Sequence, residues 1–442
     1  MQQGVSLKKI YVVSYNLYEQ DKCHLQLFFR IFLKPQTYNK DIHQIEINQI
    51  DQKALYILEK LISKGHLAYL VGGSVRDLLL KQTPKDFDIS TSARPEEIKT
   101  IFPSTLLIGK RFRLAHVRFG RKIIEVSTFR SGGVQNEQLI TEDNIWGTPQ
   151  EDVLRRDFTI NGLFYDCEKE LVIDYVEGFS DVKNKVLRVI GVPYQRFKQD
   201  PVRMIRCLKF QARFGLSVEE DARLALVDCK KDITKSSQAR ILEEVMRMLE
   251  SGSARVFFQL MTDHGVLQEI LPKIASFLEI AEGNQIYLYL DEADKLLHSK
   301  PGKSLDRAVL VSCLIFPLFE QHIKNQFISK NKTPHFGEIF QESNIVLNKV
   351  FQPFLMIPKR LKIQVMGILT SQYRLTPLRK KKDQKIRIPR APEFNLALKF
   401  FSIRCSLEPG LTEIYHRWND AFKKIDPLLV KKRIRTKRPP RK

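Results

Sequence analysis

A pair of glycines directly after a short apolar segment is the first feature whose chemistry can be inferred. Gly72 and Gly73 follow the apolar residues 68–71, and the residues after them have the composition of a helix start. A helix N-terminus of this kind binds phosphate, because its free N–H groups and the positive end of the helix dipole face the anion. The segment therefore predicts a turn that contacts the phosphates of a nucleotide.

Two aspartates separated by one residue follow this turn. Asp86 and Asp88 lie in a segment of strand character, and side chains at i and i+2 of a strand point to the same face. Most isolated pairs of this kind are solvated strand ends, but a pair after a phosphate-binding turn can hold one or two Mg²⁺ ions against the phosphates. We therefore predict nucleotidyl transfer from a nucleoside triphosphate, with Asp86 and Asp88 as metal ligands and catalytic residues.

Glu125 is the best candidate for a third carboxylate at this site. It lies inside an apolar segment, residues 123–127, that reads as a strand. A charged side chain in such a strand needs a partner if it is buried. We predict a catalytic role for Glu125, and the alternative is a strand residue that faces solvent.

Several cations have the spacing of phosphate ligands. Arg76 lies one turn into the expected helix, where it can reach a triphosphate or form a local bridge with Asp77. Arg155 and Arg156 suit phosphates by their bidentate geometry. Asp157, at the start of an apolar segment that we expect to be helical, suits a ribose hydroxyl or a helix N-cap.

A second group of candidate nucleotide-binding residues lies at the start of a helix near residue 200. Pro201 suits the first helical position, and Arg203 and Arg206 fall on one face at i and i+3. Asp200 can cap this helix, or it can hold Arg203 against the edge of a base. We expect Asp200, Arg203 and Arg206 to contact the nucleotide.

The elements that must position these residues follow from periodicity. A helix is expected over residues 50–64, and later helices over 201–213, 241–249 and 254–264. Between them, strands are expected over residues 68–71, 87–90, 106–108, 114–119 and 123–127, with a hairpin turn at 119–122. The pattern predicts an α+β protein in which a small α/β domain precedes a mainly helical remainder.

The charge composition of the chain indicates the kind of partner that it binds. The 442 residues include 73 Lys and Arg against 50 Asp and Glu, a net charge of +23. A polyanion, with nucleic acid as the first candidate, is the expected partner, although a generally basic proteome would give the same excess. The six cysteines are scattered without metal-ligand spacing, and no apolar run could span a membrane, so we expect a cytoplasmic protein without membrane contact.

Several motifs together resemble the class II nucleotidyltransferases, which are the bacterial poly(A) polymerases and the tRNA CCA-adding enzymes. The motifs occur in the family order and read LVGGSVRDLLL, KDFDIS, RRDFTINGLFYD, DYVEGFSDVKNKVLRVIG and DPVRMIR. They extend over roughly residues 68–216. Residues 107–117 are similar to the signature that separates poly(A) polymerases from CCA-adding enzymes, and residues 390–394 are weakly similar to the C-terminus of the poly(A) polymerases.

The resemblance implies a polymerase-β-like head followed by a helical neck and body. It implies two Mg²⁺ ions held by the carboxylate pair at 86 and 88, and ATP as the substrate. Triphosphate contacts would fall on Gly72, Gly73, Arg76 and Arg156, the ribose contact on Asp157, and base reading on the aspartate and arginine at 200 and 203. One departure is Gln199, because the family usually has an acid there, and this change puts base selection in question.

We therefore expect five regions. They are an N-terminal extension (1–45), a nucleotidyltransferase head (46–165), a nucleotide-selecting and RNA-binding neck (166–260), a helical RNA-binding body (261–425) and a disordered basic tail (426–442). The expected activity is template-independent addition of AMP from ATP to the 3′ ends of RNA, either mRNA or tRNA, and no DNA partner is expected. The alternatives are a CCA-adding enzyme and a non-catalytic RNA-binding protein.

Overall fold

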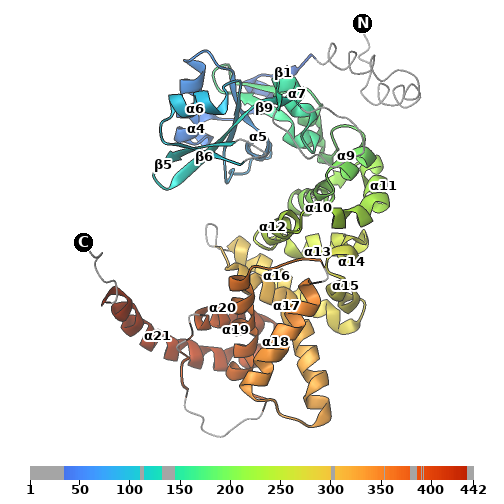
Figure 1. The fold of residues 1–442 in the computed structure, drawn as a ribbon, viewed down its shortest axis with the longest axis vertical. Helices are drawn as coiled ribbons and strands as arrows, with labels where there is room; N and C mark the ends of the chain where they lie inside the picture. Colours follow the sequence, from blue (N-terminus) through green and yellow to red (C-terminus); the bar gives the residue numbers. More distant parts are fainter. Residues whose placement is uncertain are drawn as a thin grey trace. The chain divides into compact units, whose positions relative to one another are not determined.

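The chain forms two compact units, one up to Val192 and the other from Pro193 onward (Figure 1). The computed structural model describes residues 34–109, 114–131, 145–299, 304–352, 354–378, 386–389, 391 and 393–435.

The first unit is built on an eight-stranded sheet in the order β1-β10-β9-β2-β3-β6-β5-β4. Its strands are β1 (Gln36–Tyr38), β2 (Ala68–Val71), β3 (Asp88–Thr91), β4 (Thr105–Ile108), β5 (Leu114–Phe119), β6 (Lys122–Thr128), β9 (Leu163–Asp166) and β10 (Leu171–Asp174). Only the β3–β6 pair is parallel among the described pairings, and the others are antiparallel. The remaining short strands are β7 (Arg130–Ser131), β8 (Ile145–Trp146) and β11 (Val186–Leu187).

The five strands predicted from the sequence are confirmed to within two residues at each end. The hairpin between β5 and β6 turns at Gly120, whose φ of +63° is a conformation that favours glycine, and Phe119 pairs with Lys122. The hairpin matters for function because it carries Glu125 to a position beside β3.

The sheet extends beyond both predicted borders of the head. Before residue 46, β1 pairs with β10, and after residue 165, β9 continues into the β9–β10 hairpin. The segment after Asp157, expected to be helical, forms one 3₁₀ turn (Thr159–Asn161) and then β9. All four residues of β9 are buried, so the strand lacks the alternation by which sequence reveals a strand.

Helices cover one face of this sheet. They include α4 (Gln52–Ile62), which is capped by Asp51 and buries Ala54, Ile57, Leu58 and Leu61, and α6 (Pro95–Ile101), which packs beside it. The other helices of the unit are α3 (Lys40–His43), α5 (Gly73–Leu79), α7 (Pro149–Leu154) and α8 (Gly178–Asn184).

The second unit is mainly helical. Its larger elements are α9 (Pro193–Gln199), α10 (Val202–Phe214), α11 (Glu220–Cys229), α12 (Gln238–Leu249), α13 (Ala254–Asp263), α14 (Val266–Ile270), α15 (Pro272–Leu278), α16 (Asn284–Ser299), α17 (Arg307–Gln326), α18 (Phe336–Phe351), α19 (Lys359–Leu375), α20 (Phe394–Leu407) and α21 (Thr412–Arg435), and β12 is Ser217–Val218. The predicted border between neck and body at residue 260 falls inside α13, which packs against both α10 and α16. The contacts of α13 therefore join the expected neck and body instead of separating them.

The C-terminal region differs from the expected disordered tail. Helix α21 continues to Arg435, so residues 426–435 are helical, and residues 436–442 lie outside the described part. Within the described residues, no helix has the length and apolar character needed to cross a membrane, and the five described cysteines are free.

Candidate nucleotidyl-transfer site

Strand pairing brings Asp88 and Glu125 side by side. Asp88 is the first residue of β3, and the next residue, Ile89, pairs with Val126 of the parallel strand β6. Because side chains alternate along each strand, Asp88 and Glu125 share the face that also carries Ser90 and Ser127, whose hydroxyl oxygens lie 2.9 Å apart. Asp86 lies two residues before Asp88, ahead of the strand, and is exposed. The structure therefore brings the three predicted carboxylates into one region of the first unit.

The electrostatics of Asp88 reflect this grouping. Burial raises its pKa to about 6, and the carboxylates of Glu125 and Asp86 add to the rise, while the guanidinium of Arg156 opposes it. Glu125 also lies 3.6 Å from Nε2 of His116, its cross-strand neighbour, and its side chain is 44% exposed. A cation at this face would relieve the repulsion between the carboxylates.

The arginine nearest these carboxylates is fixed by a buried aspartate. Arg156 donates to Asp152 Oδ2 from Nε (3.2 Å) and Nη2 (2.8 Å), and Nη2 also lies 3.3 Å from Ser90 Oγ. Arg155 donates from Nε to the other carboxylate oxygen of Asp152 at 2.9 Å. Burial alone would raise the pKa of Asp152, but the charges and hydrogen bonds of the two arginines hold it below its ordinary value.

Sequence reasoning missed Asp152, although a signal for it exists. Asp152 precedes Arg155 and Arg156 by three and four residues, which is the spacing of side chains that meet on one face of a helix. Its role in the structure is to fix the orientation of both guanidinium groups.

The predicted phosphate-binding turn lies directly beside Arg156. Gly72 is the N-cap of α5 and has a φ of +64°, and a Cβ atom at this position would lie 3.1 Å from Arg156 Nη1. Gly73 is the first residue of α5. The glycine turn, the arginine and the carboxylates thus belong to one continuous surface.

Replacement of Gly72 by alanine is expected to raise the KM for the nucleotide about tenfold. The new Cβ would both strain the backbone and displace the Arg156 guanidinium, and loss of one charged hydrogen bond corresponds to about 1.5–3 kcal/mol. The matched control is Gly120→Ala, because Gly120 has nearly the same φ (+63°) and no atom within 4 Å of a new Cβ. Steady-state kinetics in which both variants have the same KM would contradict a role for the contact with Arg156.

Arg76 is buried in a polar chain, and the predicted local bridge to Asp77 is confirmed. It donates to Asp77 Oδ1 from Nε (3.0 Å) and Nη2 (2.7 Å), and from Nη1 to Asn161 Oδ1 at 2.5 Å. Asn161 in turn donates from Nδ2 to Asp157 Oδ1 at 3.0 Å. Asn161 was missed as a site residue, because an amide four residues after an aspartate shows nothing in sequence of its distant partner, Arg76.

The cap alternative for Asp157 is wrong. The 3₁₀ turn after it begins from Phe158 without a side-chain cap, and Asp157 Oδ1 instead accepts the N–H of Phe158 at 2.9 Å together with the Asn161 amide. The predicted contact of Asp157 with a ribose remains a prediction.

The other predicted nucleotide contacts lie in the second unit. Asp200 does not cap α10, whose N-cap is Pro201, and its carboxylate pairs with Arg240 of α12 through two hydrogen bonds of 3.0 and 2.9 Å. The cap reading of Asp200 is therefore wrong. Arg203 is buried on α10, close to Asp200 in the chain.

Two further neck residues have partners of their own. Arg206 Nη1 lies 3.3 Å from Glu244 Oε1, and its guanidinium lies over the Phe210 ring at 5.5 Å from the centroid. Gln199, which replaces the usual acid, is buried and accepts from Arg196 Nη1 at 3.4 Å. A neutral amide thus takes the place of a carboxylate beside a buried arginine.

The donor chemistry of the carboxylate face suits a hard divalent cation. Mg²⁺ is bound by one or two carboxylates together with substrate phosphates and water. Within the described residues, no group of three or more His, Cys, Asp or Glu side chains is arranged to hold a metal ion, so Asp86 and Asp88 alone are the candidate pair. The raised pKa of Asp88 is the observation that supports this fit, because a bound cation would offset the cost of its negative charge.

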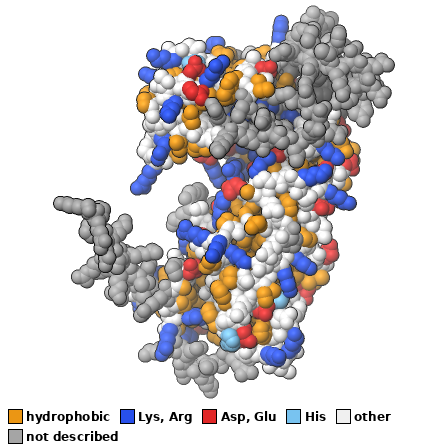
Figure 2. Space-filling view, in the orientation of Figure 1, with side chains coloured by type: hydrophobic (Ala, Val, Ile, Leu, Met, Phe, Trp, Pro, Cys, Tyr) orange, Lys and Arg blue, Asp and Glu red, His pale blue; other side chains and the backbone are white. Residues whose placement is uncertain are grey.

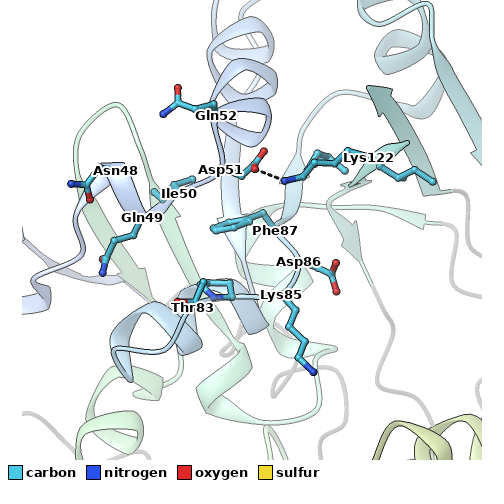
Figure 3. A pocket seen from close by; sticks show the side chains of 13 residues that line it. Asn48, Gln49, Ile50, Asp51, Gln52, Thr83, Lys85, Asp86, Phe87 and Lys122 are labelled. Carbon is cyan, nitrogen blue, oxygen red and sulfur yellow. Dashed lines mark hydrogen bonds and ion pairs between the residues drawn. The ribbon is translucent and has the colours of Figure 1, made fainter. Parts of the chain in front are cut away.

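A separate hollow of about 430 Å³ borders the carboxylate face (Figure 3). It is lined by Asn48, Gln49, Ile50, Asp51, Gln52, Thr83, Pro84, Lys85, Asp86, Phe87, Lys122, Ile123 and Ile124. Figure 3 shows the Phe87 ring inside the hollow and the ion pair between Asp51 and Lys122 at its edge. Asp88, Glu125 and Arg156 do not line it, so we do not assign the triphosphate to this hollow.

Asp88→Asn is expected to stabilise the metal-free protein at neutral pH. A carboxyl group whose pKa is about 6 in the folded state and 3.8 otherwise binds its proton more tightly when folded, so stability falls as pH rises through this window. The difference corresponds to on the order of 2–3 kcal/mol at pH 7. Thermal melts in metal-free buffer should show a higher Tm for the variant at pH 7.5, with the gain shrinking as the pH falls from 6 towards 4. Equal melting temperatures at pH 7.5 would contradict the raised pKa.

Comparison with known proteins gives two family matches and relatives along most of the chain. Residues 68–188 match the poly(A) polymerase head domain, and residues 215–278 match the probable RNA and SrmB-binding site of polymerase A. The chain is 32% identical to poly(A) polymerase I of Haemophilus influenzae over 408 residues, which cover 87% of this chain and 88% of that protein. It is 33% identical to poly(A) polymerase I of Escherichia coli O6:H1 over 386 residues, which cover 84% of this chain and 81% of that protein. The CCA-adding enzyme of Lactobacillus delbrueckii is 35% identical over 226 residues, which cover 51% of this chain and 57% of that protein.

Solved structures share the fold. The apo form II of a CCA-adding enzyme has a TM-score of 0.51 and 19% identity, covering 77% of this chain and 76% of that chain. A tRNA nucleotidyltransferase complexed with a primer tRNA and an incoming ATP analogue has a TM-score of 0.50 and 21% identity, covering 87% of this chain and 100% of that chain. These likenesses confirm the predicted fold class, a sheet-containing head followed by a mainly helical remainder.

Proposed function

Because this chain belongs to the family of RNA nucleotidyltransferases that includes the bacterial poly(A) polymerases and the CCA-adding enzymes, we propose that it adds AMP from ATP to RNA 3′ ends without a template. The observation that carries the choice of poly(A) addition is the extent of similarity. The poly(A) polymerase I relatives match 84–87% of the chain, whereas the CCA-adding enzymes match 51–55%. The helical C-terminal half is thus shared with the poly(A) polymerases. Part of the expected signature segment, residues 110–113, lies outside the described residues.

The proposed reaction needs no protein nucleophile. The RNA 3′-hydroxyl attacks the α-phosphorus of ATP, the bond to the β,γ-diphosphate breaks, and pyrophosphate leaves. Asp86 and Asp88 would hold Mg²⁺, which supplies Lewis-acid stabilisation of the phosphoryl charge when bound. Arg156, fixed by Asp152, would offset negative charge on the triphosphate, and the free N–H groups of the first turn of α5, which begins at Gly73, would donate to its oxygens.

The remaining groups orient the substrates. Glu125 lies beside Asp88, where it can accept a hydrogen bond from the attacking hydroxyl. Asp157 is held in place by the Asn161 amide, and its carboxylate is the candidate acceptor for a ribose hydroxyl. Asp200 and Arg203 supply acceptors and donors for a base edge. Catalysis in this proposal comes from positioning and charge stabilisation.

Product analysis distinguishes poly(A) addition from CCA addition. The purified protein would be incubated with an unstructured RNA and with a tRNA that lacks its 3′ CCA, each with single nucleotides and with all four. We expect homopolymeric A tails on both RNAs, with ATP used in preference to CTP, and sequencing of the products provides the measurement. A defined CCA end on the tRNA, with no extension of the unstructured RNA, would assign the chain to the CCA-adding activity instead. No incorporation in any reaction would favour a non-catalytic RNA-binding protein.

A further inference from the structure

Two exposed aromatic side chains lie one helical turn apart on α18. Phe336 and Phe340 are 42% and 40% exposed, although large aromatic side chains are usually buried. They stand at i and i+4, so both project from the same side of the helix, with about 6 Å between their positions along the axis. This distance is close to twice the 3.4 Å spacing of consecutive bases in a nucleic acid strand.

One cation lies directly against this pair. The guanidinium of Arg374, from the neighbouring helix α19, lies over the Phe336 ring at 4.5 Å from the centroid. The other cations of α19, which are Lys359, Arg360 and Lys362, lie at its opposite end, where Lys362 donates to Asn348 of α18, and the helix has no acidic residue. Figure 2 shows basic and apolar side chains close together on the visible face of the helical unit. A phosphate next to a base stacked on the Phe336 ring would therefore meet the positive charge of Arg374.

The acidic residues of α18 are engaged within the protein. Glu338 accepts the backbone N–H of His335 at 2.8 Å in the N-terminal capping box of α18. Glu342 lies 2.6 Å from Nε2 of His322 on α17. Both carboxylates thus have partners within the protein, and the side chain of Glu338 remains 42% exposed.

We propose that Phe336, Phe340 and Arg374 form a platform on which unpaired bases of single-stranded RNA stack. The inference rests on the proposed function and extends it, because it adds an RNA contact outside residues 215–278, where the family match to an RNA-binding region lies. Aromatic rings beside cations are the usual means of binding single strands without reading their sequence, since every base has a face that can stack. A guanidinium next to the ring adds a second planar surface and a charge for the phosphate.

The exposed apolar area is small for a protein partner. Two phenylalanines that are each exposed by about two-fifths contribute on the order of 100 Å² apiece, against about 800 Å² per partner in a standard protein interface. One or two bases need only the rings themselves. The platform is therefore better matched to a nucleic acid strand than to a folded protein.

Binding of a fluorescently labelled, unstructured RNA of about 20 nucleotides tests the platform. The full-length variant Phe336→Ala/Phe340→Ala is expected to bind roughly tenfold or more weakly, as loss of base stacking predicts. The matched control is Ile345→Ala, which removes a similarly exposed (38%) apolar side chain from the same helix and should keep the wild-type Kd. Circular dichroism would verify that each variant is folded.

Conservative variants separate stacking from apolar contact. Phe336→Trp should retain the wild-type affinity, whereas Phe336→Leu, which keeps apolar area without a π-face, should bind several-fold more weakly. Wild-type affinity for the RNA in the double alanine variant, or in Phe336→Leu, would overturn the proposal, because either result would show that the aromatic ring face is not needed. Failure of the proposed function is a different result, namely a wild-type protein that adds no AMP to RNA, and it is measured independently of binding.

Discussion

Asp86→Asn and Asp88→Asn are each expected to reduce nucleotidyl transfer by on the order of a thousandfold while leaving the protein folded. Each change removes one negative ligand from the candidate metal pair, and the Lewis-acid stabilisation that a metal gives a phosphoryl transition state amounts to several kcal/mol. Asp86 is exposed, and Asp88 is partly exposed at the first position of β3, so replacement by an amide of the same shape leaves the packing of the core unchanged. The measurement is the rate of AMP incorporation at saturating RNA and ATP, with Mg²⁺ varied.

The control for this prediction is Asp41→Asn, which removes an exposed carboxylate from the same unit. It should retain wild-type activity. In the wild type, the Mg²⁺ concentration needed for half-maximal activity should also rise as the pH drops below about 6, because a proton and the metal compete for the Asp88 carboxylate. Activity of a folded Asp86 or Asp88 variant within tenfold of wild type would show that these residues are not the metal ligands.

Arg203→Ala is expected to lower the preference for ATP over CTP at least tenfold, and by more than it lowers total incorporation. A site that reads a base through charged hydrogen bonds loses about 1.5–3 kcal/mol of discrimination for each one removed. Arg240→Ala should also lower the preference for ATP over CTP, but by a smaller factor. It removes the bidentate partner of the Asp200 carboxylate, whereas Arg240 itself is not expected to contact the base. Competition between ATP and CTP on one RNA gives the ratio directly.

Arg223→Ala provides the control for base selection. Arg223 is an exposed arginine of the same unit that donates to Glu220, three residues earlier on α11. Its removal should leave the ATP to CTP ratio unchanged. An unchanged ratio in folded Arg203→Ala would mean that the base is read by other residues, and the assignment of Asp200 and Arg203 would then fail.

Local patterns in the sequence were sufficient for much of the head. The strands that carry Asp88 and Glu125 alternate apolar and polar residues, and the hairpin between β5 and β6 has a glycine where the turn requires a positive φ. The glycine pair, which forms the N-cap and first residue of α5, predicts a helix start, because a helix start depends only on local backbone geometry. The ordered motifs were enough to predict the family and the fold class.

The partners of the site residues depended on the tertiary structure. Arg76 meets Asn161, 85 positions away, and Asp200 meets Arg240, 40 positions away, and no local period encodes such distances. The buried strand β9 was read as a helix start, because a strand covered on both faces has no polar alternation, and its identity depends on its pairing with β2. Residue types and spacing thus determined which groups could do the chemistry, because these are properties of short segments. Only the packed fold decided which groups meet, because contacts between distant segments are selected by the burial and pairing of the whole sheet and helical core.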